Sequence, residues 1–154
     1  MISRVAAVAA ACALAVGGVL AAGCGEAGDG SSVAAKSLWG HIYQGVAAQR
    51  VGTGPPPLKR PSDLYVVFKK EKGSGKLIRW RANCNYYGTK VHLDGDRLRP
   101  VEVGGTLMGC PRPWLREDKW LALFMEAGPR FHFSGGRLVL SVGGKKIELR
   151  EKNA

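Results

Sequence analysis

Cysteine is the residue type with the most chemical possibilities in this sequence. The chain of 154 residues contains four cysteines, Cys12, Cys24, Cys84 and Cys110. Cysteines form disulfides, bind metals or act as reactive thiols, and their surroundings distinguish these uses. Cys12 lies inside an apolar run and Cys24 directly follows it, whereas Cys84 and Cys110 lie in the mixed sequence beyond. The two pairs therefore need separate explanations.

Residues 1–23 have the pattern of an export signal. Arg4 provides a positive charge, and an uncharged apolar run follows from Val5 to Ala22, as in the first two regions of a signal peptide. The run is also long enough for a transmembrane helix that stays in place. Its length alone therefore leaves both interpretations open.

The residues at the end of this run favour a lipoprotein. The segment Leu20-Ala21-Ala22-Gly23-Cys24 resembles the lipobox of bacterial lipoproteins, in which the signal is cut before a Cys that carries a diacylglyceryl group. That pattern prefers Leu three places before the Cys, where this chain has Ala21. We expect cleavage between Gly23 and Cys24 and acylation of Cys24 with palmitate-type chains, at the extracytoplasmic face of the cell membrane. A retained anchor and ordinary secretion are the alternatives.

Residues 24–36 predict a flexible tether between the lipid and a domain over residues 37–154. The tether is rich in Gly, Ser and Ala and shows no apolar periodicity. A random coil of this length reaches about 20 Å. Acyl chains contribute about 0.8 kcal/mol per buried CH₂, and two or more chains anchor a protein stably. The domain would therefore be held close to the membrane surface.

Cys84 and Cys110 remain after removal of the signal. An even pair of cysteines outside the cytoplasm favours a disulfide, and closing a loop of this length stabilises by about 3 kcal/mol in the chain-entropy model. A metal site would need further ligands, but no His is near either Cys in the sequence. A redox-active pair more often has Cys-x-x-Cys spacing. A structural disulfide is favoured, with no metal and no cofactor.

The other chemically active residues form no recognised motif. Gly-x-Ser-x-Gly, His-Glu-x-x-His and a phosphate-binding loop do not occur in the sequence. His41, His92 and His132 are widely spaced, and we expect His92 and His132 to be exposed on strands rather than to bind metal. Asp94 and Asp96 fit a turn better than a calcium loop, because basic residues follow where further oxygen ligands are needed.

An envelope hydrolase is the least favoured alternative. It would need carboxylates that converge in a cleft. The candidates are Glu102, Glu117 and Asp118. We therefore predict that the protein is not an enzyme.

Positive charge is the remaining chemical feature. Lys and Arg number 23 against 12 Asp and Glu, a formal net charge of +11, of which the predicted signal contains only Arg4. An exported protein with this charge meets anionic headgroups and wall polymers rather than nucleic acid. A solvated face without a partner is the alternative. The candidates for binding an anionic surface are Lys69, Lys70, Lys72, Lys76, Arg79, Arg81, Arg97 and Arg99.

The elements that carry these residues have a dominant period of two. Apolar and polar residues alternate in short segments separated by Gly-rich or Asp-Gly turns, which is typical of antiparallel strands. The predicted strands lie near residues 64–69, 78–83, 89–93, 97–103, 131–133, 137–142 and 146–150. They predict a mainly β fold, a small antiparallel barrel-like sheet that is closed or nearly closed. Pro100 indicates an edge or a bulge.

One segment has helical periodicity instead. Large apolar residues recur at helical spacing from Pro113 to Ala127, and Gly128-Pro129 ends the pattern. Core packing is the favoured role of this stripe, and a binding groove is the alternative. The stripe contains Trp114, Trp120, Leu121, Phe124 and Met125. The stretch from Gln44 to Asp63, with its prolines and glycines, predicts an irregular loop that is either mobile or functional.

Both remaining cysteines lie in motifs shared with a known family. The motifs are Cys84-Asn85 ahead of Tyr87-Gly88, then Gly105-Thr106-Leu107-Met108-Gly109-Cys110, then Glu117 with Trp120-Leu121 and Leu123. They resemble the META domain, or HslJ-like, family. The segments Leu38-Trp39-Gly40 and Gly135-Gly136-Arg137-Leu138-Val139-Leu140 are similar to its first and last strands, and Asn83 stands where it often has Gly. The similarity covers most of residues 37–150.

The resemblance implies a small β-rich barrel with one packed helix and a location in the cell envelope. Members have been linked to the heat-shock response, novobiocin resistance, and motility or secretion. No catalytic activity defines the family, so it implies a non-catalytic role in binding or envelope stress, with a protein or an anionic surface as partner.

The alternative function is a carrier that holds a small ligand inside the barrel. An interior filled by aromatic side chains would leave no room for such a ligand. The side chains in question are Trp80, Trp120, Phe124, Phe131 and Phe133.

The lipoprotein prediction can be tested by intact-mass measurement on protein isolated from membranes. The chain should begin at Cys24 and carry the additional mass of its acyl chains, because the signal is removed before that residue. An intact Met1 would contradict cleavage. A Cys24 of unmodified mass would contradict lipidation.

Overall fold

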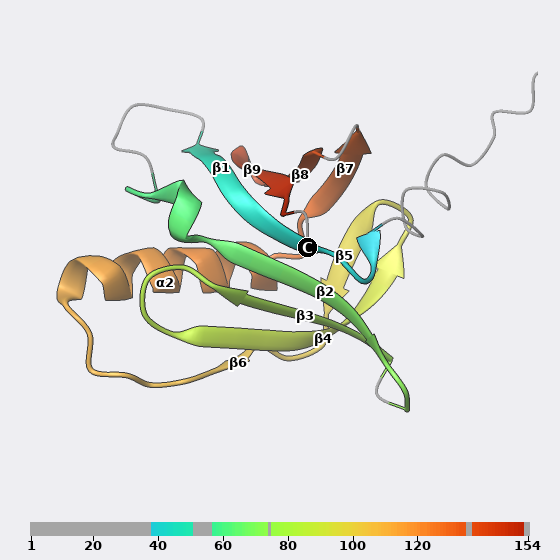
Figure 1. The fold of residues 1–154 in the computed structure, drawn as a ribbon, viewed down its shortest axis with the longest axis horizontal. Coiled ribbons are helices and arrows are strands. Elements are labelled where there is room, and N and C mark those ends of the chain that lie inside the picture. Colours follow the sequence, from blue (N-terminus) through green and yellow to red (C-terminus); the bar gives the residue numbers. More distant parts are fainter. Residues whose placement is uncertain (1–37, 51–56, 74, 135–136, 153–154) are drawn as a thin grey trace, which may run out of the picture.

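The computed structural model describes residues 38–50, 57–73, 75–134 and 137–152 (Figure 1). The predicted signal peptide and tether, including Gly23 and Cys24, lie outside the described residues. Cleavage and lipidation therefore remain predictions.

Eight antiparallel strands form a closed ring. The ring order is β3-β2-β1-β9-β8-β7-β5-β4, and β4 pairs back onto β3. The strands are β1 (Ile42–Arg50), β2 (Tyr65–Glu71), β3 (Gly75–Arg81), β4 (Tyr86–Asp94), β5 (Arg97–Pro100), β7 (Arg130–Ser134), β8 (Arg137–Val142) and β9 (Lys145–Glu151). The short strand β6 (Gly104–Gly105) pairs with the other edge of β4. The predicted antiparallel barrel is confirmed.

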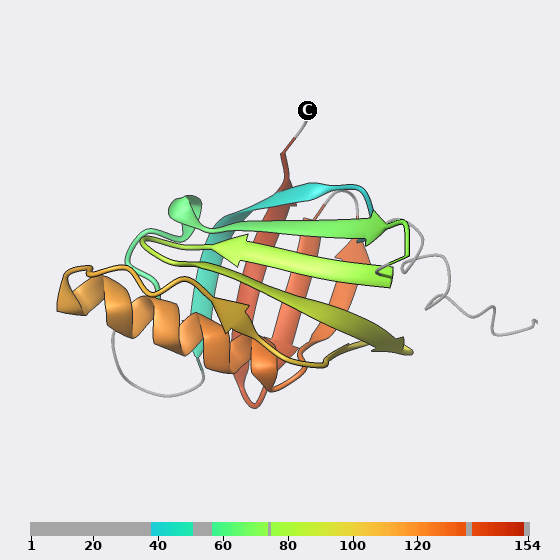
Figure 2. The same ribbon diagram turned by 90° about the horizontal axis from the view of Figure 1, so that it is seen from below.

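One helix and a short 3-10 turn complete the fold. Figure 2 shows β2, β3 and β4 crossing in front of β1, β9, β8 and β7 at a steep angle. Helix α2 (Arg112–Glu126) lies along the lower ends of the latter strands in this view. The 3-10 turn η1 (Pro61–Asp63) precedes β2. The helix therefore covers one end of the barrel.

Alternating side chains fill the barrel interior as predicted. Val66 and Phe68 of β2 and Ile78 and Trp80 of β3 are buried, while the residues between them are more exposed. Residues paired across neighbouring strands point to the same face of the sheet. The inward side chains of each strand therefore pack against those of the next strand around the ring. The interior further contains Leu138, Leu140, Ile147, Leu149, Phe124 and Phe131, with Phe133 and Trp120 partly buried. A ligand inside the barrel would have to displace these side chains.

The helix lies within one residue of its predicted bounds. Its inward face buries Leu121, Phe124 and Met125, and Gly128 follows with a φ of +66°. A Cβ at Gly128 would lie 2.7 Å from the Leu98 carbonyl oxygen, so the chain turn here requires glycine. The prediction that Trp114 is a core residue is wrong. It is 39% exposed because the first helical turn extends past the barrel wall.

The predicted irregular stretch from Gln44 to Asp63 is wrong for its first part. Strand β1 continues to Arg50, and a bulge between Gly45 and Ala47 interrupts the alternation that the sequence prediction relied on. A Cβ at Gly45 would lie 2.0 Å from the Pro61 carbonyl oxygen, so η1 packs directly on the strand backbone. Residues 51–56 lie outside the described residues.

Two smaller boundaries also differ from the predictions. Leu38 and Trp39 are buried but precede β1 in a turn, rather than forming the first strand. The strand predicted over residues 97–103 ends at Pro100, although the Val101 N–H still donates to the Lys90 carbonyl oxygen of β4 at 3.0 Å. The first assignment rested on the family resemblance, and the second on a strand returning after the Asp94-Gly95 turn.

Tyr43 of β1 makes folding sensitive to alkaline pH. Its hydroxyl is buried and has no hydrogen-bond partner among the described residues. Burial, and secondly the Glu151 carboxylate, raise the pKa of Tyr43 to about 12. The folded state therefore retains a proton that the unfolded chain releases near pH 10. The contribution of Tyr43 to the free energy of unfolding is therefore fully present below pH 10 and is lost as the pH rises towards 12.

Tyr43→Phe should remove this pH dependence. At pH 7 the variant should unfold at nearly the same denaturant midpoint, because the lost hydroxyl has no partner. At pH 11.5 the wild type should have lost about 2 kcal/mol more of its free energy of unfolding than the variant. Denaturant unfolding followed by circular dichroism at both pH values measures this difference. Parallel losses in the two proteins would contradict the assignment.

Candidate functional site

A disulfide closes the region where α2 approaches β4. Cys84 and Cys110 are joined in a disulfide with their Cα atoms 6.4 Å apart. The residues are 26 positions apart and fix the loop before α2 to the start of β4. The predicted disulfide is confirmed, and both thiols are consumed by it.

Asn85 is the centre of the polar contacts next to this disulfide. It is buried, and its backbone N–H and side-chain Nδ2 both donate to Oδ2 of Asp118, at 2.9 and 3.0 Å. Its own Oδ1 accepts from Thr106 Oγ1 at 3.1 Å and from the Met108 N–H at 2.9 Å. One side chain therefore connects β4, the following loop and α2.

The carboxylates considered for hydrolysis are used in these contacts. Asp118 is buried and held by Asn85, and Glu117, also buried, accepts from Asn83 Nδ2 at 2.6 Å. Glu102 is exposed in the segment after β5 and is not part of this cluster. Adjacent carboxylates on a helix do not face each other. The three candidates therefore do not converge on one reacting position.

The buried carboxylate also influences its surroundings electrostatically. Burial, and secondly the negative charge of Asp118, raise the pKa of Tyr87. The Tyr87 ring stacks on Trp80, with ring centroids 5.7 Å apart. A Cβ at Gly105 would lie 2.5 Å from this ring, so β6 passes directly over it. The cluster is thus packed against the barrel wall.

The histidines and the predicted turn aspartates have separate surroundings. His92 and His132 are exposed on strands as predicted, whereas Nδ1 of His41 lies 2.5 Å from Glu151 Oε1. Hydrogen bonds from Arg99, and then its charge, lower the pKa of Asp94. In the described ranges, no group of three His, Cys, Asp or Glu side chains is placed to hold a metal ion.

The predicted basic residues do not form one face. Lys69, Arg79 and Arg81 point outward on β2 and β3, because they alternate with buried residues. Lys70 and Lys76 pair with each other in the inward register of Phe68 and Ile78, beyond the filled core. Lys72 lies in the turn between the strands. Arg97 and Arg99 lie on β5, farther around the ring.

Several of these arginines already have partners. Arg79 lies 3.3 Å from Glu71, and Arg99 lies 2.7 Å from Asp94. Arg97 donates to the carbonyl oxygens of Gly128 and Ala127, at 2.8 and 3.1 Å, and so binds the end of the helix. Exposed ion pairs of this kind contribute little stability. Arg97 in contrast supports the narrow β5–β7 junction, which contains a single register pair.

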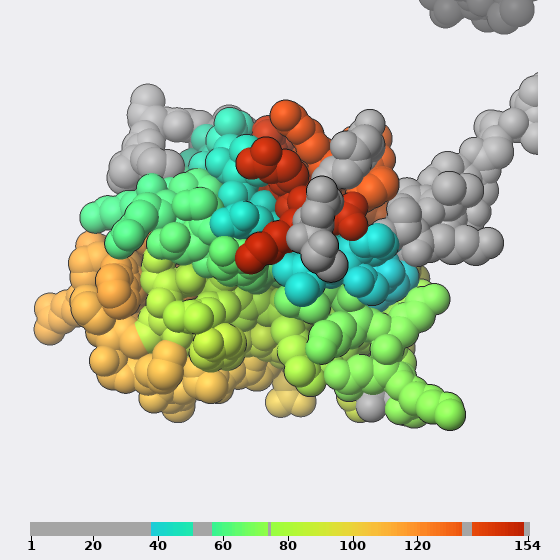
Figure 3. All heavy atoms as spheres, in the orientation of Figure 1, coloured from blue at the N-terminus to red at the C-terminus, as the bar shows by residue number. Residues whose placement is uncertain are grey.

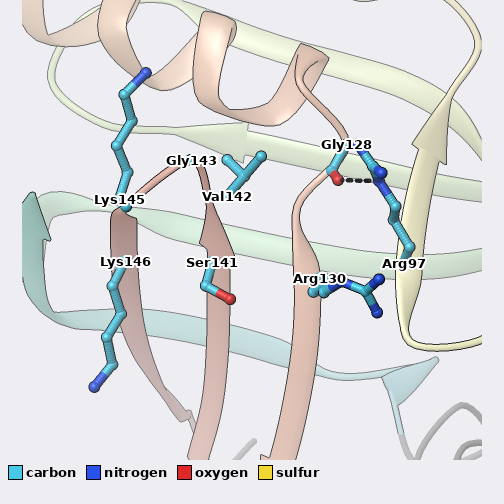
Figure 4. Close-up of a pocket in the computed structure, with 9 residues that line it drawn as sticks. Arg97, Gly128, Arg130, Ser141, Val142, Gly143, Lys145 and Lys146 are labelled. Carbon is cyan, nitrogen blue, oxygen red and sulfur yellow. Dashed lines mark hydrogen bonds between the residues drawn. The ribbon is translucent and has the colours of Figure 1, made fainter. Parts of the chain in front are cut away.

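A hollow of about 550 Å³ at the β8–β9 end of the barrel gathers cations that the sequence prediction missed (Figure 4). Lys146, Ser141, Arg130 and Arg97 form one row across four strands. Arg130 pairs with Asp96, and Lys146 lies 2.7 Å from Glu148. Alternation with Phe131 and Ile147 indicated outward positions, but only the strand order brings the row together.

A sequence model of the META domain matches residues 44–154. The chain belongs to the META domain family. The match covers the described barrel from Gln44 in β1 onwards, including the disulfide and the helix. A search of curated protein sequences gives no match.

Two solved structures share the META domain fold seen here. An NMR structure of a protein from Burkholderia xenovorans superposes with a TM-score of 0.63 at 15% identity, covering 79% of this chain and 88% of that one. A second NMR structure has a TM-score of 0.54 at 17% identity, covering 75% and 92%. These similarities support the barrel architecture but say nothing about activity.

The residues that carry the META resemblance meet in space. We call the disulfide and the hydrogen-bonded residues around Asn85 the disulfide cluster. It contains the motif residues Cys84, Asn85, Thr106, Met108 and Cys110, and Glu117 is bonded beside it to Asn83. These motif residues therefore attach the helix to the barrel. None of the helices in the described part of the chain has the length and apolar character to cross a bilayer.

Removing the disulfide should weaken the attachment of the helix. Cys84→Ala combined with Cys110→Ala should lower the free energy of unfolding by about 3 kcal/mol, because the unfolded chain gains loop entropy. Thermal unfolding with and without dithiothreitol measures the effect. Reductant should lower the melting temperature of the wild type and leave the double variant unchanged. Equal melting temperatures of oxidised wild type and variant would contradict a stabilising disulfide.

Proposed function

We propose that the protein is a membrane-anchored extracytoplasmic lipoprotein whose META domain has a non-catalytic binding role at an anionic surface. Acylated Cys24 and the tether over residues 24–36 would hold the domain at the membrane. The family assignment supports an envelope-associated role without catalysis. The dispersed carboxylates and the closed disulfide support the same conclusion.

The observation that carries the proposal is the position of a group of lysines beside the entry of the chain into the domain. This group, the lysine hairpin, consists of Lys69, Lys70, Lys72 and Lys76 around the β2–β3 turn. The Gly40 N–H donates to the Phe68 carbonyl oxygen at 2.9 Å, and Lys76 Nζ lies 5.4 Å from the centre of the Trp39 ring. The tether would therefore enter next to the lysines.

The strand register places other cations at the far end of the barrel. On β1, Tyr43 pairs with Glu151 near the chain entry, whereas Arg50 pairs with Lys145 beside the hollow of Figure 4. A strand rises about 3.3 Å per residue, so these ends are on the order of 20 Å apart. Exposed charges are screened over about 8 Å at physiological ionic strength. Of these two groups, only the lysine hairpin would act on the anchoring membrane, together with the exposed Lys152, whose N–H donates to the Ile42 carbonyl oxygen at the chain-entry end of β1.

Each lysine close to an anionic membrane contributes about 1 kcal/mol. The lysine hairpin would therefore orient the tethered domain rather than anchor it, a task that the acyl chains perform. A carrier role inside the barrel is less favoured, because the described interior is filled by Trp80, Phe124 and Phe131.

Vesicle co-sedimentation tests the proposal with a matched pair of variants. The chain from residue 24 onward, with Cys24→Ser to remove acylation, should bind phosphatidylglycerol vesicles and not neutral phosphatidylcholine vesicles. Lys70→Gln with Lys72→Gln should weaken binding at 0.15 M salt by about thirtyfold, from two contributions of about 1 kcal/mol. Lys145→Gln with Lys146→Gln removes the same charge at the far end and should change binding less than threefold.

Two outcomes would overturn the orientation argument. Binding that is independent of anionic lipid and of salt would exclude an electrostatic contact. Equal losses in the two double variants would show that only net charge matters.

A further inference from the structure

A groove on the outer side of β2, β3 and β4 has a different character from the lysine hairpin. Its central hollow has a volume of about 340 Å³, and its outward lining side chains are Tyr65, Val67, Arg79, Arg81 and Tyr86. Figure 3 looks onto this side of the molecule, where the green side chains of β2 and β3 lie beside the orange segment that contains the helix. We call this surface the Tyr–Arg groove.

A second hollow extends the groove towards the helix. It has a volume of about 310 Å³ and shares Tyr65 and Arg81 with the first. Its further lining includes the half-exposed Trp114 of α2, and Arg60 together with Asp63, whose carboxylate lies 3.5 Å from Arg60. The Tyr–Arg groove is therefore elongated and has aromatic rings and guanidinium groups along its length. This shape suits a segment of a polymer better than a compact ligand.

Strand register explains why the surface is hollow. Tyr65, Arg81 and Tyr86 form one row across the three strands. The next row contains Val67, Arg79 and Gly88. Gly88 has no side chain, and neither has its partner Gly104 on β6. The surface next to the tyrosines is therefore low at this edge of β4. The groove is thus built by cross-strand neighbours.

The disulfide cluster fixes one wall of the groove. The Tyr86 N–H donates to Thr106 Oγ1 at 3.1 Å, and the Thr106 N–H donates to the Tyr86 carbonyl oxygen at 2.9 Å. Thr106 is itself bound to Asn85. Tyr86 is therefore held by a rigid backbone although its ring is 53% exposed. An exposed aromatic ring on a fixed backbone loses little entropy when it binds.

The arginines of the groove are placed beside the rings. The Arg81 guanidinium lies 4.9 Å from the centre of the Tyr86 ring and donates to its hydroxyl at 2.9 Å. This contact uses one edge of the guanidinium and leaves further N–H donors for a carboxylate. Arg79 is shared with Glu71 at 3.3 Å, an exposed pair that a ligand carboxylate can replace.

The charges and surfaces of the groove select among ligands. Aromatic faces pack against the apolar C–H faces of pyranose rings, while arginine pairs with carboxylates. A neutral polysaccharide would leave Arg81 without a charged partner and Arg79 with Glu71 alone. A polyphosphate would leave the apolar lining without partners. A sugar chain with a carboxylate on its rings satisfies both requirements.

We propose that the Tyr–Arg groove binds a segment of an acidic polysaccharide, a chain of pyranose rings that carry carboxylates. The proposal goes beyond the membrane role, because the groove uses neither the lysine hairpin nor the lipid anchor. Failure of vesicle binding would therefore leave it intact, and its own failure would leave membrane orientation intact.

Three probes separate the contributions of ring and charge. The full chain, purified from membranes in a neutral detergent, is titrated at 0.15 M salt while tryptophan fluorescence is followed. Oligogalacturonate supplies rings and carboxylates, its methyl ester supplies the same rings without charge, and polyphosphate supplies charge without rings. The acid should bind at least tenfold more tightly than either comparison probe.

Variants locate the binding on this surface. Tyr86→Ala and Arg81→Gln should each weaken binding of oligogalacturonate about tenfold, with melting temperatures that show an intact fold. Arg137→Gln removes another exposed strand arginine, from β8, and should change binding less than twofold. Equal losses in Arg81→Gln and Arg137→Gln would reduce the effect to net charge and overturn the site.

The choice of polymer has its own test. A single-stranded oligothymidylate also offers planar rings and negative charge, and such bases stack on aromatic side chains. Oligogalacturonate should bind more tightly than this oligonucleotide. Tighter binding of the oligonucleotide, or no binding of oligogalacturonate, would overturn the proposal.

Discussion

The buried contact between Asn85 and Asp118 is the interaction on which the arrangement around the helix depends. A carboxylate out of water must be supplied with donors, and Asn85 gives two to one oxygen of Asp118 while its own oxygen accepts from the loop that leads to α2. The second oxygen, Oδ1, has no partner among the described residues. Replacing the Asn85 side chain would therefore remove one of the two donors to the buried carboxylate and leave two loop donors without their acceptor, a larger loss than one hydrogen bond. The neighbouring disulfide limits the same loop covalently.

Sequence periodicity predicted the barrel because each inward position is specified by the strand itself. Val66, Phe68, Ile78 and Trp80 follow this rule. Strand β1 was missed since its inward residues after Tyr43 are small, Gly45 and Ala48, and its bulge breaks the period after Gly45. The ring order could not be predicted either, because the β5–β7 junction contains one register pair and is supported by contacts with the end of the helix. Alternation thus shows which face of a strand a residue lies on, but not which strand lies beside it.

The candidate site shows the same limit more clearly. Alternation correctly placed Arg79 and Arg81 outward, and the even cysteine pair correctly predicted a disulfide. It could not show that Asn85 meets a carboxylate 33 residues later, or that Tyr65 and Tyr86 flank Arg81. Nor could it separate the lysines beside the chain entry from the cations near Lys145 at the far end of β1. These relations arise from register, which a single sequence does not contain.

The positions of the three surfaces would give the domain a direction if it is tethered as proposed. The lysine hairpin lies beside the chain entry, the cationic hollow lies at the opposite end of β1, and the Tyr–Arg groove lies on the wall of β2, β3 and β4. If the hairpin lies against the anchoring membrane, the groove extends along the wall to Trp114 near the opposite end. A polymer in the groove would then run away from the membrane rather than along it. Because Asn85 and Thr106 fix the Tyr86 wall, the contact that attaches the helix would also set the angle at which such a polymer is held.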